Sequence, residues 1–413
     1  MSPPAIRDAV EELLPSAEQL LCNLIRYPST PGRELEAMSF LQEAFRATDA
    51  NIERVPLSDA IISDPDYSTP IPDIRYDGRF NLRIKRSGHG GGRSLLLNTH
   101  VDVVPPSENM TDPWTPRVED GIVFGRGACD AKGQIALIFV VFKAIQALRL
   151  KLRGDVTAHL VVEEENGGNG TLSMIRRGVK ADACIVLEPS ESRLHTSIRG
   201  AVWFRLLFTG RAGHSGQAAA TRSALLMALD AMAGMERYHA DLLARSREVP
   251  LFESYPNPMP LTFGHLEAGN WPASAPSRAV LEGVLGFLPN RTKEEVCRDL
   301  RRVLAGHGEE FVRNCDLSFM YRHDSSVLSP GHDLPRGLLR AAGETGQPLS
   351  ISGMPASCDA WFYNNQSGIP TVVFGPGSLR HAHSKDEQIA MRDIGAAAGI
   401  VLSFLEKYCG ASE

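Results

Sequence analysis

The sequence predicts an α/β protein in which a smaller α+β domain interrupts a larger one, and three observations lead to this fold class. The chain has 413 residues, more than one hydrophobic core usually organises, so two domains are expected. From about residue 95 to 190, apolar runs alternate with a helical pattern, which is typical of buried strands and a crossover helix in an α/β sheet. From about residue 199 the pattern becomes that of a small α+β unit, and from about 325 the α/β pattern resumes.

These changes of pattern give the expected domain boundaries. The larger domain comprises residues 1–198 and 325–413, and the smaller domain comprises residues 199–324. The segments MSPPAIRDAVEELLPSAEQLL and MRDIGAAAGIVLSFLEKY are each expected to form an amphipathic helix. The glycine-rich segment at 88–92 is expected to form a hairpin turn.

The composition excludes several classes of function. A net charge of −6 without a long Lys/Arg run argues against binding to nucleic acid or to an anionic membrane. No segment approaches the roughly 18 consecutive apolar residues of a membrane span, and Asp8, Glu11 and Glu12 interrupt any secretory signal. Seven cysteines without a C-x-x-C pair favour reduced thiols and a cytoplasmic location. We therefore expect a small-molecule partner.

Acidic and histidine residues follow several of the expected strands, and open α/β sheets bind ligands beyond the carboxyl ends of their strands. His100 and Asp102 follow the strand LLLNT, and since residues two apart share a face, Asp102 can hold the His100 imidazole. Asp130 stands in GRGACDAKG before a long helix over 131–150, where it could cap the helix or bind a cation. Lys132 is not part of a phosphate-binding loop, because the pattern G-x-x-x-x-G-K-[ST] is absent.

Two further acidic sites end apolar strands. Glu163, Glu164 and Glu165 follow VTAHLVV, and three successive carboxylates are costly to desolvate unless a cation lies beside them. The alternative is an exposed acidic turn. Glu188 follows the run IVL, and Pro189 stops that strand.

Three histidines stand in segments that could approach a substrate or a metal. The segment FGPGSLRHAHSKDE offers His381 and His383, although a lone histidine in a polar loop is more often solvated. In GRAGHSG, His214 lies between glycines that would let a substrate approach the backbone. The remaining histidines are expected to be structural: His89, His159, His195, His265, His323 and His332.

The combination of imidazole and carboxylate groups indicates the kind of metal. Such mixed ligands suit Zn²⁺, Co²⁺ or Mn²⁺, and argue against a thiolate site or an all-oxygen Ca²⁺ site. The candidate ligands outnumber those of one open zinc site, so two metal ions with a shared aspartate are expected. An acid left without a metal would be the general base that takes a proton from water as it attacks a carbonyl.

The same motifs, in their order along the chain, resemble those of the M20 metallopeptidase family. This family includes acetylornithine deacetylase, succinyl-diaminopimelate desuccinylase, aminoacylases and glutamate carboxypeptidases. The matching motifs are NTHVDVV, WTPRVEDGIVFGRGACDAKG, EEENGGNGT, LEPS, GRAGHSG, GIPTVVFGPG and HSKDE. The resemblance implies an α/β/α zinc-hydrolase domain with a mixed sheet, interrupted by a ferredoxin-like lid and dimerisation domain.

The resemblance also implies a set of metal ligands. His100 and Glu188 would bind one zinc ion, Glu165 and His383 would bind the other, and Asp130 would bridge the two. Co²⁺ or Mn²⁺ would be possible substitutes for zinc.

Other residues receive catalytic roles from the same resemblance. Asp102 would orient His100, Glu164 would be the general base, and Glu163 would merely flank it. His383 is preferred to His381 as the ligand because it precedes the downstream acid pair. His214 would stabilise the oxyanion and would often come from the partner subunit of a homodimer formed through the lid.

Two positions depart from the family pattern. Ala273 stands where the lid motif usually has Asn, and Gly286 stands where many members carry Arg to bind a substrate carboxylate. Arg199, Arg278 or Arg380 could replace that arginine, and the sequence does not choose between them.

Together these residues predict a metal-dependent hydrolase that cleaves the amide bond of an N-acyl amino acid or a related N-acylated amine. One alternative is a dipeptidase or carboxypeptidase on the same scaffold. Another is a metal-stabilised binding or regulatory protein without catalysis. The acid pair Glu164 and Glu165 argues against the last alternative, because a structural zinc needs no spare base.

Overall fold

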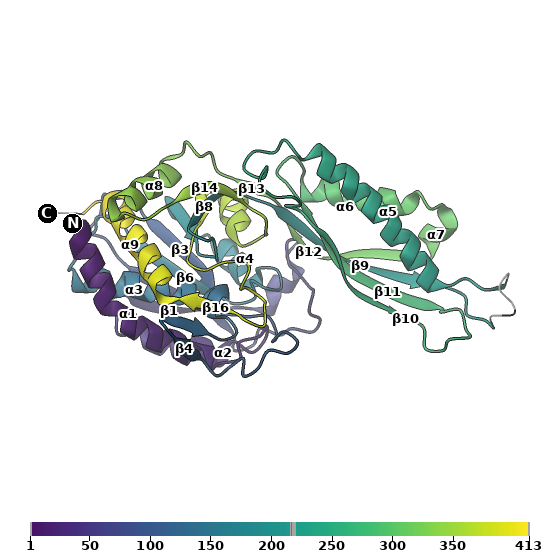
Figure 1. Ribbon diagram of the computed structural model, residues 1–413, viewed down its shortest axis with the longest axis horizontal. Coiled ribbons are helices and arrows are strands. Elements are labelled where there is room, and N and C mark those ends of the chain that lie inside the picture. Colours follow the sequence, from purple (N-terminus) through teal and green to yellow (C-terminus); the bar gives the residue numbers. More distant parts are fainter. Residues whose placement is uncertain (1, 215, 217–219, 412–413) are drawn as a thin grey trace.

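The computed structural model describes residues 2–214, 216 and 220–411 and consists of two sheet-based units (Figure 1). The larger unit is built on a mixed sheet with the strand order β1-β2-β6-β3-β7-β15-β8-β13, and β14 pairs with β8. Its strands are β1 (Asn51–Pro56), β2 (Phe80–Arg86), β3 (Leu95–His100), β6 (Val156–Val161), β7 (Ala183–Val186), β8 (Arg193–Ile198), β13 (Ser326–Val327), β14 (Ser350–Met354) and β15 (Thr371–Val373).

Helices cover both faces of this sheet, because the side chains of each strand alternate between two cores. Leu95 and Leu97 of β3 belong to the large core, and Leu96 belongs to the core on the other face. The helices that contribute to the large core are α1 (Pro3–Ile25), α2 (Leu35–Phe45), α3 (Gly133–Ala147), α8 (Asp333–Thr345) and α9 (Met391–Tyr408). The second core includes side chains from α4 (Asn169–Arg176) and from the π-helix η4 (Phe362–Gln366).

The strands that matter for the site are parallel. β3 runs parallel to both β6 and β7, and β15 runs parallel to β7. The segments after these four strands therefore emerge at the same edge of the sheet, where α/β proteins usually bind ligands.

The smaller unit, called the lid below, is a four-stranded antiparallel sheet with helices on one face (Figure 1). The strand order is β10-β11-β9-β12. Phe204, Leu206 and Phe208 of β9 pack into the lid core, whereas the residues between them face the open side of the sheet. The lid elements are β9 (Gly200–Thr209), β10 (Leu261–Ala268), β11 (Arg278–Phe287), β12 (Cys315–His323), α5 (Ala224–Arg245), α6 (Lys293–Ala305) and α7 (Glu309–Arg313).

The chain passes between the two units at two places. It enters the lid at Arg199, between β8 and β9, and it returns between β12 and β13. The boundaries expected from the sequence, at 198/199 and 324/325, lie in these two connections. We therefore propose residues 199–324 as the lid domain. The predicted fold class, an α/β protein with an inserted α+β unit, is confirmed.

The prediction of a hairpin turn at 88–92 is wrong. This segment joins β2 to β3, but β6 lies between those two strands in the sheet. Gly88 and Gly92 instead pack tightly against other backbone segments. A Cβ at Gly88 would overlap the carbonyl oxygen of Arg153, and one at Gly92 would overlap that of Cys409.

Five short elements complete the larger unit. A small antiparallel sheet has the order β16-β5-β4, from β4 (Arg117–Glu119), β5 (Ile122–Phe124) and β16 (Gln388–Ala390). The 3-10 helix η1 (Asp59–Ser63) precedes β2, and the π-helix η2 (Ala128–Lys132) precedes α3. None of the helices in the described part of the chain has the length and apolar character needed to cross a bilayer.

Candidate metal centre

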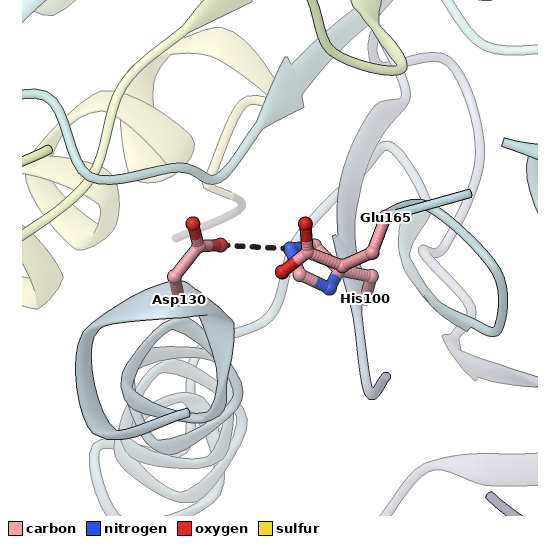
Figure 2. A group of neighbouring side chains, drawn as sticks. All are labelled: His100, Asp130 and Glu165. Carbon is pink, nitrogen blue, oxygen red and sulfur yellow. Dashed lines mark hydrogen bonds and ion pairs between the residues drawn. The ribbon is translucent and has the colours of Figure 1, made fainter. Parts of the chain in front are cut away.

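Three of the expected ligands meet beyond the carboxyl ends of the parallel strands (Figure 2). His100 is the last residue of β3, Asp130 lies in η2 just before α3, and Glu165 lies in the turn after β6. One ligand atom from each of these residues lies within 4.8 Å of those of the other two. Asp130 does not cap α3, since the N-cap residue of that helix is Lys132.

Asp130 lies between two histidines. His100 Nε2 lies 3.0 Å from Asp130 Oδ1, and His383 Nε2 lies 3.4 Å from Asp130 Oδ2. Glu188 Oε2 is 3.8 Å from His100 Nε2, and Glu165 Oε1 is 3.1 Å from His383 Nε2. The structure therefore brings all five expected ligands together, as two histidine–glutamate pairs whose histidines face different oxygens of Asp130.

The chemistry of these donors fits two zinc ions. Ligands bound at about 2.1 Å in a tetrahedral site lie about 3.4 Å from one another, which is close to the separations seen here. The nearest charged partners of the carboxylates are histidines rather than lysine or arginine. Carboxylates gathered with few cations nearby favour the binding of positive ions.

The pKa values of the cluster reflect this crowding of charge. Burial raises the pKa of Glu188 to about 7, and burial together with the Asp130 charge also raises the pKa of Glu165. Although burial opposes it, Glu165 and Asp130 raise the pKa of His383 to about 11. Against burial, the two histidines lower the pKa of Asp130.

Glu164, the expected general base, stands next to the cluster. Burial and the charges of Glu188 and Asp359 raise the pKa of its carboxyl well above the usual value. The Asp102 carboxylate accepts hydrogen bonds from the backbone N–H groups of Glu164 and Glu165, at 3.1 and 3.0 Å.

Asp102 contacts His100 through both its backbone carbonyl and its carboxylate. The backbone carbonyl oxygen of Asp102 lies 2.9 Å from His100 Nδ1, whereas its carboxylate Oδ1 lies 3.6 Å away. The carbonyl thus accepts the closer contact with the imidazole, and the carboxylate mainly holds the acidic turn. Asp102 therefore links a histidine to the backbone of two glutamates.

Glu163, expected only to flank the base, is fully buried and anchors the same turn. Its carboxylate pairs with Arg79 and accepts hydrogen bonds from the Tyr76 hydroxyl at 2.7 Å and the Asn169 amide at 2.9 Å. Arg79 also pairs with Glu34 at 2.8 Å. The run of three acids gave a signal for Glu163, but no sequence pattern pointed to Arg79 or Glu34.

Two residues near the cluster have other contacts. His381 lies near Gln388, with its Nδ1 3.4 Å from the amide nitrogen, and His383 is the histidine that reaches Asp130.

The buried Lys132 donates hydrogen bonds to the carbonyl oxygens of Leu24 and Tyr27 at the end of α1. Burial lowers the pKa of Lys132 to about 7. This lysine therefore fastens α1 to the start of α3.

His214 does not join the cluster of its own chain. It is exposed in the connection between β9 and α5, where it forms a bridge with Ser274, and its Nδ1 accepts a hydrogen bond from Gly216 N–H. β9 has 10 residues and is therefore about 33 Å long, and it leads away from the larger unit (Figure 1). Ala273 is exposed beside Ser274 in the same region.

Arg199 lies where the chain enters the lid and has an unused hydrogen-bond donor. Its Nε donates to the carbonyl oxygen of Pro355 at 2.7 Å, but its buried Nη1 has no hydrogen-bond partner among the described residues. Burial lowers the pKa of Arg199 to about 10. A Cβ at Gly286 would overlap Nη1, so the glycine leaves room for this guanidinium.

The other two arginines considered from the sequence are less suitable. Arg278 is exposed at the start of β11 and pairs in register with Thr209, at the outer end of β9. Arg380 is 87% exposed and lies 3.8 Å from Glu191.

A mixed α/β sheet with histidines and carboxylates gathered beyond its parallel strands, together with a separate antiparallel lid, is the fold of M20-type hydrolases. Residues 96–407 match the family described as "Peptidase family M20/M25/M40". The chain belongs to this family and is a hydrolase of amide bonds. The family resemblance inferred from the sequence motifs is thereby confirmed.

Similar proteins cover nearly the whole chain. An N-formyl-4-amino-5-aminomethyl-2-methylpyrimidine deformylase of Bacillus subtilis is 27% identical, with 98% of this chain and 97% of the relative covered. A succinyl-diaminopimelate desuccinylase of a Methylobacterium species is 30% identical, with 96% and 97% covered. Among solved structures, a Bacillus subtilis protein described as a dinuclear metal binding peptidase from the M20 family has a TM-score of 0.66 at 14% identity. That alignment covers 96% of this chain and 98% of the other.

Proposed function

We propose that this chain is a di-zinc deacylase that hydrolyses the amide bond of an N-acyl amino acid or a related N-acylated amine. The observation that carries the proposal is the position of Asp130, whose two carboxylate oxygens face His100 and His383 separately. One zinc ion would be held by His100 and Glu188, the other by Glu165 and His383, with Asp130 shared. Co²⁺ or Mn²⁺ would suit the same donors.

Two zinc ions in this site would polarise the substrate carbonyl and lower the pKa of water. Glu164 accepts the proton of the attacking water while the hydroxyl oxygen bonds to the carbonyl carbon. When the C–N bond breaks, Glu164 gives the proton to the leaving nitrogen. The products are a carboxylate and a free amine.

The surrounding residues support Glu164 in this role. Its backbone is held by Asp102, and the turn that carries it is anchored through Glu163 and Arg79. A base on a fixed turn keeps its carboxylate at one distance from the reacting carbon, which favours proton transfer.

A deacylase is favoured over a peptidase because both curated relatives described above remove an acyl group from an amine.

Arg199 Nη1 is the donor that we propose to bind an anionic group of the substrate, since it is buried and has no hydrogen-bond partner among the described residues. We further propose that His214 acts in the site of a partner subunit, because it follows β9, a strand that leads away from the larger unit, and its described contacts are with Ser274 and Gly216.

The test is a panel of substrates with zinc-loaded protein. N-formyl, N-acetyl and N-succinyl derivatives of amines and amino acids would be compared with dipeptides by measuring free amine release. We expect kcat/KM for at least one acyl derivative to exceed that of every dipeptide. Chelation should abolish turnover, and added Zn²⁺ should restore it. Faster cleavage of dipeptides would overturn the deacylase assignment.

A further inference from the structure

A buried ion pair lies beside the backbone of the candidate ligand Asp130. Arg126 Nη1 lies 2.6 Å from Glu387 Oε2, and the two side chains are 1% and 0% exposed. Arg126 precedes η2, and Glu387 precedes β16, so the pair joins segments 261 residues apart. A charged pair that is fully removed from water needs further hydrogen bonds to be stable there.

One set of these hydrogen bonds holds the segment that carries Asp130. Glu387 Oε1 accepts hydrogen bonds from the backbone N–H groups of Cys129 and Asp130, both at 3.1 Å. The position of the Asp130 backbone therefore depends on the Glu387 carboxylate.

The other set holds the segment that carries His383. Arg126 Nη2 donates to the Ser107 hydroxyl oxygen at 2.7 Å, and that hydroxyl donates to the carbonyl oxygen of His383 at 2.6 Å. His383 has a φ of 59°, a left-handed conformation that is unfavourable for a residue other than glycine. The hydrogen bond from Ser107 helps to keep this histidine in that conformation.

The ligands of the other metal position are held differently. His100 is the last residue of a central strand, and its Nδ1 lies 2.9 Å from the carbonyl oxygen of Asp102. Glu188 follows β7, the strand next to β3. Both are fixed by the main sheet, whereas His383 lies in a loop and is half-exposed.

We propose that Arg126 and Glu387 are positioning residues for the second metal ion, the one assigned to Glu165, His383 and Asp130. This inference rests on the proposed two-metal site. Through one ion pair, the two residues set the distance between the Asp130 and His383 backbones. The affinity for the second ion depends on this pair, while the affinity for the first depends mainly on the sheet.

The experiment is a zinc titration of the metal-free full-length chain by calorimetry, with metal content measured after dialysis. In Glu387→Gln, an amide N–H₂ would replace one carboxylate oxygen and would face either the Arg126 guanidinium or the N–H groups of Cys129 and Asp130. We expect the second zinc ion to bind about 10- to 100-fold more weakly than in the unaltered chain, as is usual when residues that orient ligands are removed. The first ion should keep its affinity within about threefold.

Two further variants guard against a simple loss of folding. Ser107→Ala removes only the connection to His383, and it should lower the affinity for the second ion by less than Glu387→Gln does. Asp299→Asn removes a largely buried carboxylate that pairs with Arg302 in the lid, and it should leave both zinc affinities unchanged. Cobalt titration followed by visible absorption gives a second readout of each site.

An unchanged affinity for the second ion in Glu387→Gln would overturn the inference. An equal loss of affinity for both ions would also overturn it. An unaltered chain that binds only one zinc ion would also overturn it. Failure of the proposed function would look different, because the unaltered chain would then bind two ions without cleaving any acyl substrate.

Discussion

In the larger unit, three of the five candidate ligands lie at the carboxyl ends of adjacent parallel strands, and all but His383 are largely buried. In the lid, by contrast, His214 is exposed in the connection that follows β9, the strand that leads away from the larger unit (Figure 1). His100 and Asp130 contact each other within the cluster, whereas the described contacts of His214 are with Ser274 and Gly216 of the lid.

This difference separates the part of the site that one chain can form alone from the part that it cannot. The five candidate metal ligands converge within a single chain. The expected oxyanion donor lies too far along the lid to reach the cluster of its own chain in this arrangement. Metal binding is therefore expected of an isolated chain, and full catalysis is expected to need the lid of a partner.

The largest effect is expected from Glu164→Gln, which tests the larger unit alone. The amide cannot take a proton from water, so kcat should fall by about 10³-fold or more. Both metal ions should remain, because Glu164 is not assigned to either. Kinetics and metal analysis on the same sample check this. Turnover close to that of the unaltered chain would remove Glu164 as the base.

A smaller effect is expected from His214→Ala, which tests the lid. Loss of one oxyanion donor usually lowers kcat by about 10²- to 10³-fold, and the metal content should not change. Mixing this variant with Glu164→Gln should restore activity, because one site of a mixed dimer would contain both residues. At equal amounts, about a quarter of the full activity is expected from a symmetric dimer. Absence of any recovery would argue that His214 acts within its own chain or not at all.

The next effect concerns Arg199, at the junction of the two units. Arg199→Met should raise KM for substrates with an anionic group by about 10- to 100-fold, the usual value of a hydrogen bond to a charged group. Gly286→Ala should act in the same direction, because its Cβ would displace the guanidinium. Arg278→Met, at the outer end of the lid, is the control. Equal changes for neutral and anionic substrates would contradict the assignment.

The smallest effect is on stability and concerns the buried histidine His159 of β6. Burial lowers its pKa to about 3, so between that value and about 6.5 only the unfolded chain binds the proton. The free energy of unfolding therefore falls as the pH is lowered through this window. Between pH 7 and pH 5, the chain should lose about 2 kcal/mol more than the variant His159→Gln does.

Urea unfolding of both proteins at the two pH values measures this difference. Several buried carboxyl groups, such as Glu34 and Glu188, have raised pKa values and act in the opposite direction. Their contribution is the same in both proteins, so it cancels from the comparison. His265→Gln on the lid strand β10 serves as a second reference. An identical loss in the unaltered chain and in His159→Gln would refute the prediction.

Much of the fold could be predicted from local patterns. The last helix, α9, coincides with the segment MRDIGAAAGIVLSFLEKY, and α3 lies within the helix expected over 131–150. β10 and β12 carry a weak signal, because many of their residues are exposed or only half-buried and their apolar alternation is incomplete. The turn at 88–92 was misread because two strands that follow each other in the chain are not neighbours in the sheet.

The sequence by itself determined which residue types stand at the ends of the strands, and the order of motifs determined the family. Hydrophobic periodicity and short motifs are local properties, so they can be read without coordinates. Only the tertiary structure decided which of these residues meet.

The tertiary structure placed the two oxygens of Asp130 against different histidines. It also joined Glu163 to Arg79, and Arg126 to Glu387 across 261 residues. It also separated His214 from the cluster. The physical reason is that a buried charge needs a partner in space, and the packing of the chain, rather than its order, supplies that partner.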